Sequence, residues 1–352
     1  SQTALSNRNL IINGAMQVAQ RGTSTTGVTG IGYQAVDRWE NAINTAGTYT
    51  ISQDTNAPDG FSSSLKYLCT VADASLAADD YVTFRQKLEG QNVQHLNYGS
   101  SGAKTVTASF WVKSNVTGTY TLSLEQESPA SYFNVHTYTI NSADTWEYKT
   151  ISFAGHVSTA ITNNNATGLE LQHWLASGST FSSGTVLSDT WTQTTANRVS
   201  SSQVNLSSAV NNYWQITGAQ LEVGEQATPF EHRSIGDELL RCQRYYQRLS
   251  DNHGNSAVAI ASGVSYSTTS HYFVFHHTVP MRAAFTLGYS SVSDIRVYTQ
   301  GTSAAFSALA RNGGTDTTSE INGSTSSGIG TAGNGVWFRA GSTAYVDFDA
   351  EL

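Results

Sequence analysis

Five aromatic residues lie in or beside polar segments of the chain, where their rings could stack on a ligand. Trp174, Phe181 and Trp191 border or occupy a Ser/Thr/Gly-rich excursion over residues 176–203, and Tyr132 and Phe133 lie in a second loop. Exposed aromatic planes bind sugars by covering the apolar C–H face of the ring, while amides and hydroxyls bond its hydroxyl groups. The pattern predicts a carbohydrate contact. The alternative is that these rings pin down their own loops.

The sequence gives no sign of a catalytic centre. It contains no GxSxG, HExxH, Walker or CxxC motif. The segment 328–333 matches GxGxxG, but it precedes a predicted strand rather than the helix that a dinucleotide site needs. A glycan-degrading enzyme would need two carboxylates converging in a groove, and no spacing indicates such a pair. We therefore expect a protein that is not an enzyme.

Metal ligands are equally hard to find. Asp37, Glu40, Glu222 and Glu225 lie near the ends of predicted strands, where a sandwich can hold a structural Ca²⁺. No calcium loop of recognisable spacing surrounds them, so we predict no metal and no cofactor. A structural Ca²⁺ remains the alternative.

Composition and charge exclude several classes of partner. The chain has 352 residues and a formal net charge of −8, which opposes nucleic-acid binding because that requires clustered Lys and Arg. No apolar run approaches the ~20 residues of a membrane span, and residues 1–16 lack the continuous apolar core of a signal peptide. We expect a chain made in a cytoplasm, with no membrane insertion.

Short alternating runs of Thr, Val, Tyr, Phe and Trp predict an all-β chain. In the clearest strand, 104–113, Val106, Ala108, Phe110 and Val112 share one face because strand side chains alternate. Seven to ten such segments before residue 224 predict a β-sandwich, specifically a jelly roll. Residues 256–352 repeat the pattern more briefly. The predicted domains are an N-terminal jelly roll at 1–230, a linking helix at 231–252 and a smaller C-terminal β-sandwich at 253–352.

The linking helix is the strongest helical signal in the chain. Ser234 is a good N-cap, and Asp237 three residues later approximates a capping box. Apolar residues follow at spacings of 4, 3, 4 and 3, which is the seam of a short coiled coil. The seam predicts either packing on the chain's own sandwich or contact between copies at a symmetry axis. Its members are Ile235, Leu239, Cys242, Tyr246 and Leu249.

The region around this helix carries a family resemblance. The segment QLEVGEQATPFEHRSIGDELLRCQRYYQ resembles one found in tail-fibre and other virion-surface proteins of tailed bacteriophages, with a QLE-x-G turn, a TPFE-x-R stretch and a CQRYY ending. Further similar segments flank it. They are Asn9–Gly14, Gln20–Gly22, Val279–Arg282 and Phe348–Leu352.

The resemblance covers nearly the whole chain and implies a carbohydrate-binding-module-like jelly roll, a linking helix and a C-terminal β domain, commonly as a trimer. It implies a virion component that contacts a host surface, and it transfers no catalytic residues. Tail fibres usually begin with an anchoring segment, whereas the sandwich begins almost at once here, so we expect the virion surface rather than the tail specifically.

The leading hypothesis is a homotrimeric phage fibre, contacting other virion proteins and binding a host cell-surface glycan. The alternative is a capsid decoration or head-fibre protein with a purely structural role.

Overall fold

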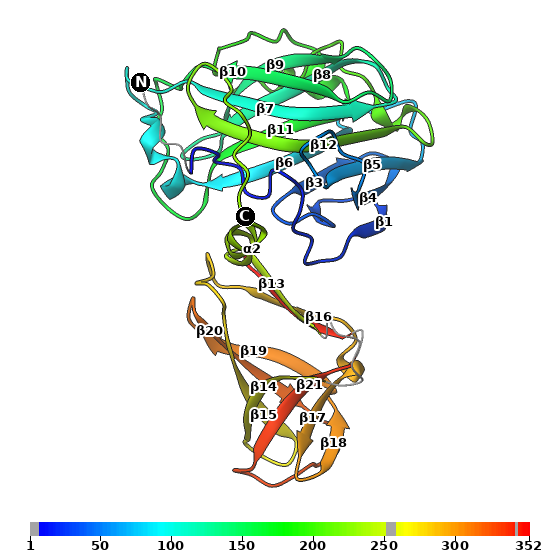
Figure 1. Cartoon of the computed structure of the whole chain (residues 1–352), viewed down its shortest axis with the longest axis vertical. Helices are drawn as coiled ribbons and strands as arrows, with labels where there is room; N and C mark the ends of the chain where they lie inside the picture. Colours follow the sequence, from blue (N-terminus) through cyan, green and yellow to red (C-terminus); the bar gives the residue numbers. More distant parts are fainter. Residues whose placement is uncertain (1–6, 251–257, 342–343) are drawn as a thin grey trace. The chain divides into compact units, whose positions relative to one another are not determined.

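The computed structural model describes residues 7–250, 258–341 and 344–352. The chain divides into two compact units, one comprising the described residues up to Glu238 together with Leu352, and the other Leu239–Glu351. Each unit is built almost entirely of antiparallel strands (Figure 1). No helix among the described residues has the length and apolarity needed to cross a membrane.

The first unit contains two six-stranded sheets. In spatial order, sheet A consists of β1 (Ser24–Val28), β4 (Thr48–Asp54), β5 (Ser64–Val71), β12 (Tyr213–Val223), β7 (Val106–Ser114) and β10 (Glu147–Phe153). Sheet B consists of β2 (Gly32–Tyr33), β3 (Glu40–Asn44), β6 (Tyr81–Glu89), β11 (Thr167–Ser177), β8 (Gly118–Gln126) and β9 (Tyr132–Ile140). When β5 is counted as the first of eight strands, the sheets run 1-8-3-6 and 2-7-4-5. This is jelly-roll order, as the sequence predicts.

The core of the first unit lies between the two sheets and is rich in aromatic rings. Trp39 stacks on Phe84 with ring centroids 4.5 Å apart, and Trp214 contacts the same Phe84 edge-on at 5.7 Å. His173 of β11 is fully buried among them, 5.4 Å from the Trp214 ring. Alternation along each strand therefore sends one set of side chains into this core and leaves the other set on the outer face of its sheet.

The second unit also has two sheets. One has three strands in the order β13 (Tyr246–Ser250), β22 (Tyr345–Asp349) and β16 (Thr286–Tyr289). The other has seven, in the order β18 (Thr302–Ala305), β17 (Ile295–Thr299), β21 (Gly335–Ala340), β14 (Val258–Ser265), β15 (Ser270–His276), β20 (Thr318–Ser324) and β19 (Ala308–Gly314). Phe273, Phe338 and Phe348 are fully buried in its core. The unit is the smaller β-sandwich that the sequence predicts.

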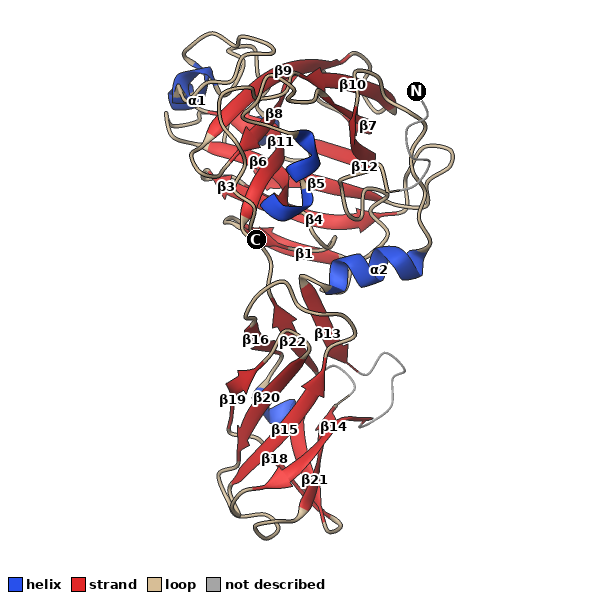
Figure 2. Ribbon diagram, turned by 90° about the vertical axis from the view of Figure 1, so that its left-hand side faces the viewer, coloured by secondary structure: helices blue, strands red, loops and turns tan. Residues whose placement is uncertain are grey.

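Helices are short and few among the described residues. The longest is α2 (Ile235–Gln243), and α1 (Ser179–Ser182) is a single turn (Figure 2). Short 3-10 turns, η1 (Gly90–Asn92), η2 (Gln94–Leu96), η3 (Thr195–Asn197), η4 (Leu206–Ser208) and η5 (Val292–Asp294), complete the list. Ser234 caps α2 as predicted, because its Oγ accepts a hydrogen bond from the Asp237 N–H at 3.1 Å.

The predicted helix at 231–252 is too long, and the five-residue helical seam is wrong. The helix ends at Gln243, and Tyr246 and Leu249 belong to β13, where Tyr246 pairs with Asp349 of β22. Pairing in a sheet overrides the helical periodicity here. Cys242 and Tyr246 are fully buried, whereas Ile235 is 58% exposed, so the five residues form no common stripe. The predicted domain boundary at 252–253 lies outside the described residues.

Candidate functional site

The outer face of sheet B carries polar and aromatic side chains in the middle of its strands. On β11, Leu169, Leu171 and Leu175 point into the core, and the alternate residues Gln172 and Trp174 lie on the outer face. These outward residues are nevertheless buried, with Trp174 only 2% exposed. A covering segment must therefore shield this face from water.

The excursion between β11 and β12 provides that cover. Its main chain folds back on itself, because the Val199 N–H donates to the Phe181 carbonyl at 3.0 Å and the Gly184 N–H to the Ala196 carbonyl at 2.8 Å. It is also tied to the sheet, since Thr192 and Phe133 exchange two main-chain hydrogen bonds of 2.9 and 3.0 Å. Loops of this length are uncommon unless they have a function. This one is held in place by sheet B.

Where the excursion meets sheet B, the two enclose a pocket of about 270 Å³. Strands β6 and β11 line it from the sheet, and the excursion contributes Phe181 of α1 and Arg198, which follows η3. The lining residues are Tyr81, Thr83, Arg85, Gln172, Trp174, Phe181 and Arg198.

Three aromatic rings converge at this pocket. The Phe181 ring centroid lies 5.7 Å from that of Tyr81 and 5.5 Å from that of Trp174. Tyr81 and Phe181 are partly exposed, whereas Trp174 is buried behind them and donates its indole N–H to Ser123 Oγ at 3.2 Å. The rings of Tyr81 and Phe181 are therefore the surfaces available to a ligand, and Trp174 fixes their positions.

Guanidinium and amide groups complete the pocket. Arg198 forms an ion pair with Glu125, and its Cζ lies 5.6 Å from the Trp174 ring centroid. Gln172 donates from Nε2 to Glu125 Oε1 at 3.0 Å and accepts from Arg85 at 3.4 Å. These bonds fix the polar heads against the aromatic rings, so the site needs little reorganisation to bind a ligand.

Arg85 links two more carboxylates below the pocket. It forms ion pairs with Glu40 and, at 3.2 Å, with Glu170, and Lys87 also pairs with Glu40. Burial raises the pKa of the Glu170 carboxyl to about 8; Arg85 opposes this rise, and Glu125 adds to it. Arg198, Arg85 and Lys87 each already have a carboxyl partner, so none of these cations is left over for an anionic ligand.

The structure divides the five predicted sugar-contacting residues between two places. Trp174 and Phe181 line the pocket, and Phe133 is buried beneath Arg198, whose Cζ lies 5.0 Å from its ring centroid. Trp191 and Tyr132 lie elsewhere, and Tyr132 and Phe133 begin β9 rather than occupying a loop as predicted.

Trp191 and Tyr132 both pack on His156. The Trp191 ring is stacked on the His156 ring at 4.7 Å, and its indole N–H donates to the Ala154 carbonyl at 2.9 Å. Tyr132 meets the same histidine edge-on, also at 4.7 Å. Trp191 therefore fixes the excursion to the sandwich. This is the alternative prediction, in which the aromatic rings hold their own loops in place.

Tyr81, Arg85 and Arg198 line the pocket but were not among the residues predicted from the sequence. A signal for the first two exists in the sequence, because Tyr81, Thr83, Arg85 and Lys87 alternate with the buried Val82, Phe84, Gln86 and Leu88. Charges on the outer face of a strand usually indicate exposure to solvent. This face of β6 becomes part of a pocket only because the excursion, which is distant in sequence, packs over it.

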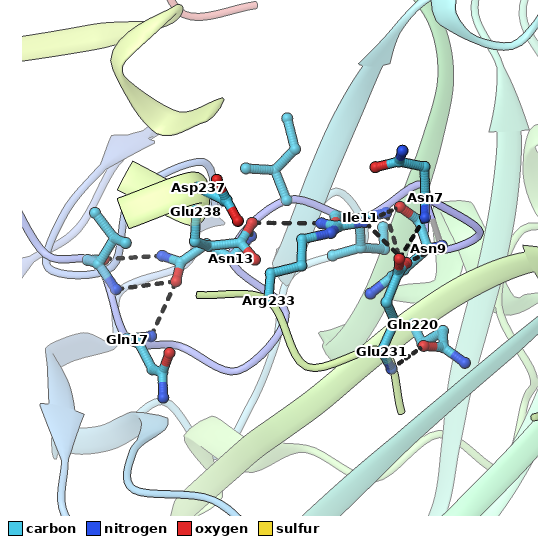
Figure 3. A network of polar contacts seen from close by, with 12 residues as sticks. Asn7, Asn9, Ile11, Asn13, Gln17, Gln220, Glu231, Arg233, Asp237 and Glu238 are labelled. Atoms are coloured by element: carbon cyan, nitrogen blue, oxygen red, sulfur yellow. Dashed lines mark hydrogen bonds and ion pairs between the residues drawn. The ribbon is translucent and has the colours of Figure 1, made fainter. Parts of the chain in front are cut away.

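The family-like motifs form a structural network in the first unit (Figure 3). Glu231 of the TPFE-x-R stretch accepts the Asn9 N–H at 2.8 Å, and Arg233 donates to the Ile11 carbonyl at 3.0 Å. Glu238 of α2 accepts the Asn13 N–H at 2.6 Å. Residues 9–13 and 231–238, more than 200 residues apart in sequence, are thus joined by hydrogen bonds.

Three of the four carboxylates considered for Ca²⁺ have other partners, and the fourth, Glu225, is exposed. Asp37 accepts from the Gln20 side chain, Glu40 pairs with Arg85 and Lys87, and Glu222 accepts from the Thr228 hydroxyl at 2.7 Å. Within the described part of the chain, no group of three or more His, Cys, Asp or Glu side chains is placed to hold a metal ion.

Comparison with known proteins gives no family. No family model matches the chain, and no curated protein matches it in sequence.

Several solved structures resemble the chain weakly. The enzymatically active domain of tailspike protein 4 from Bacteriophage CBA120 is 12% identical over 61% of this chain and 21% of the tailspike chain, with a TM-score of 0.32. A family 11 carbohydrate-binding module from Clostridium thermocellum is 10% identical over 60% of this chain and 98% of the module, with a TM-score of 0.29. A CBM22 tandem domain from Paenibacillus barcinonensis Xyn10C is 8% identical over 99% of this chain and 100% of the tandem domain, with a TM-score of 0.30. Likenesses at this level define no function for the chain.

Proposed function

We propose that this chain is a non-catalytic glycan-binding protein of a bacteriophage surface, a fibre that attaches the particle to a host-surface saccharide. The observation that carries the binding role is the pocket on sheet B, where the rings of Tyr81 and Phe181 lie beside Arg85, Gln172 and Arg198. A pyranose placed against the two rings would cover its apolar face, and the guanidinium and amide groups would bond its hydroxyls. Because Arg85 and Arg198 already have carboxyl partners, the pocket favours a neutral sugar.

Binding rather than hydrolysis fits the state of the nearby carboxylates. Glu125 is fully buried and paired with Arg198, and Glu170 is buried and paired with Arg85. Neither carboxylate lines the pocket. A glycosidase needs both carboxyl groups at the scissile bond. These two instead hold the arginines in position.

The place on the particle and the homotrimer are part of the same proposal, and the resemblance of the QLE, TPFE-x-R and CQRYY segments to phage fibre proteins supports them. Exposed apolar residues on α2, Ile235 at 58% and Leu240 at 43%, give the helix a surface for protein contact. That surface would equally suit the alternative, a capsid decoration protein. Sedimentation showing a monomer at micromolar concentration would contradict the trimer, and immunoelectron microscopy of the particle would distinguish fibre from capsid.

The binding role can be tested with a glycan array. We expect the purified chain to retain neutral glycans, and the double variant Tyr81→Ala/Phe181→Ala to lose at least about tenfold in affinity, since each stacked ring contributes on the order of 1 kcal/mol. Tyr148→Ala is the matched control, because Tyr148 is an exposed aromatic residue of sheet A outside this pocket. Equal affinity in the double variant, or a loss only in the control, would refute the assignment.

A further inference from the structure

Another pocket lies in the second unit, on the outer face of its seven-stranded sheet. Along β21, Val336 and Phe338 are buried, and the alternate residues Trp337 and Arg339 lie on the outer face. On the neighbouring β17, Tyr298 is paired in register with Trp337. Together with the β17–β18 turn they line a pocket of about 400 Å³.

Two arginines stand opposite each other on this face. Arg296 of β17 and Arg339 of β21 are partners in the sheet register, and like charges placed directly opposite destabilise a sheet. Neither forms an ion pair with a carboxylate in the described part of the chain. Arg296 bonds Ser303 Oγ at 3.2 Å, whereas Arg339 Nε is buried without a hydrogen-bond partner among the described residues. The pair is a local excess of positive charge in a chain of net charge −8.

The Arg339 guanidinium is held by aromatic rings rather than by acids. Its Cζ lies 4.2 Å from the Tyr298 ring centroid and 5.2 Å from that of Trp337. These cation–π contacts orient the group and leave its hydrogen-bonding edges available. Trp337 itself is 54% exposed, so a large aromatic plane faces water beside an uncompensated cation.

The rim of the pocket is a tight hairpin. Gln300 and Gly301 connect β17 to β18, and both have positive φ, 46° and 78°. Two central residues of positive φ are characteristic of the type I′ turn, whose twist matches the flanking strands. The turn places the Gln300 side chain, an amide donor and acceptor, at the edge of the pocket.

We propose that this pocket binds an acidic saccharide unit, one whose pyranose ring carries a carboxylate. The sugar ring would stack on Trp337, the carboxylate would accept hydrogen bonds from Arg339, and Gln300 would bond a ring hydroxyl. A neutral sugar would use the aromatic plane but leave the paired arginines uncompensated. The proposal stands apart from the sheet B pocket, which has other residues and whose arginines are paired with carboxyl groups.

The experiment compares acidic probes with neutral probes of the same size on the full chain. Isothermal titration with trigalacturonate and with galactotriose, and with sialyllactose and lactose, measures the contribution of the carboxylate. We expect at least one acidic probe to bind about tenfold more tightly than its neutral counterpart, because hydrogen bonds between a guanidinium and a carboxylate are roughly twice as strong as neutral ones. Arg339→Gln should abolish that difference, and Trp337→Ala should weaken both members of the pair.

Matched variants keep the test decisive. Arg311→Gln changes an arginine of the same sheet outside the pocket, and Tyr266→Ala removes an exposed aromatic residue that does not line it. Both should bind as the unaltered chain does, and so should Phe181→Ala, which separates this site from the one on sheet B. Equal affinity for acidic and neutral probes, failure of both acidic probes to bind, or an acid preference that survives Arg339→Gln would overturn the proposal. Inorganic sulfate that competes as well as the sugars would reduce the site to an anion site and would also overturn it.

Discussion

Glu125 and Glu170 lie directly opposite each other on β8 and β11, two buried carboxylates in one row of sheet B. Like charges in this position repel, and the site resolves the conflict in two ways. Arg198 pairs with Glu125, and Arg85 pairs with Glu170. Burial, reinforced by Glu125, also raises the pKa of Glu170, so that its carboxyl is readily protonated near neutral pH.

This arrangement predicts a stability that falls as pH rises. Glu170 binds its proton more tightly in the folded chain, with a pKa of about 8 against an ordinary 4.5. The folded state therefore holds more protons than the unfolded state between these values, and its stabilisation is complete below pH 4.5 and lost as pH rises to about 8. Glu170→Gln, which cannot ionise, should flatten that fall.

Denaturant unfolding followed by tryptophan fluorescence measures this effect, since six of the seven tryptophans precede Glu238. The exposed Glu225 supplies the control Glu225→Gln, which should retain the pH dependence of the unaltered chain. An identical pH profile in Glu170→Gln would show that the pKa of Glu170 is the same in the folded and unfolded states.

His173 predicts the opposite slope at lower pH. It is fully buried, neither ring nitrogen has a hydrogen-bond partner among the described residues, and burial lowers its pKa to about 3. The unfolded chain therefore binds the extra proton first, so stability is complete above pH 6.5 and declines as pH falls toward 3. His173→Leu should cost less than about 1.5 kcal/mol at pH 7 and should resist acid better than the unaltered chain.

The comparison is the shift of the unfolding midpoint between pH 7 and pH 4.5. His232→Gln is the control, because His232 is an exposed histidine of the same unit. If His173→Leu and His232→Gln lose the same stability in acid, then His173 is not the group that limits acid resistance.

Arg233 should be among the most costly polar residues to remove in the first unit. Its side chain is 7% exposed, pairs with Glu231 at 3.2 Å and donates to the Ile11 carbonyl at 3.0 Å. Arg233→Ala leaves the Glu231 carboxylate without its cation and should cost about 3–5 kcal/mol. Arg233→Lys keeps the charge but loses the planar fork, so it should recover only part of the loss. Guanidinium unfolding measures both, and a cost below about 1 kcal/mol for the alanine variant would mean that the network is dispensable.

The sequence predicted the fold well because alternation records which face of a strand is buried. Val106, Phe110 and Val112 are all core residues, as their spacing requires. Periodicity failed at Tyr246 and Leu249, where a helical 4-3 spacing continues into a strand. Pairing with β22, almost 100 residues later, decides that segment, and no local pattern carries this information.

The candidate site was predictable only in part for a similar reason. The composition of the excursion pointed to Trp174 and Phe181, but Tyr81 and Arg85 come from a strand about 90 residues earlier. Their place beside Trp174 follows from the pairing of β6 with β11. Register between distant strands is set by the whole sandwich, and a single sequence does not display it.

Phe181 and Trp191 offer the sharpest separation of binding from stability, because both were predicted to contact sugar and the structure gives them different surroundings. Phe181 is partly exposed at the pocket, so Phe181→Ala should weaken binding of a neutral glycan several-fold and cost less than about 1 kcal/mol of stability. Trp191 packs on His156 and the core, so Trp191→Ala should cost about 2–4 kcal/mol. Its glycan affinity, measured by titration under conditions where the variant remains folded, should fall less than twofold. The reverse result, a stable Trp191→Ala that no longer binds, would move the site from the sheet B pocket to the His156 cluster.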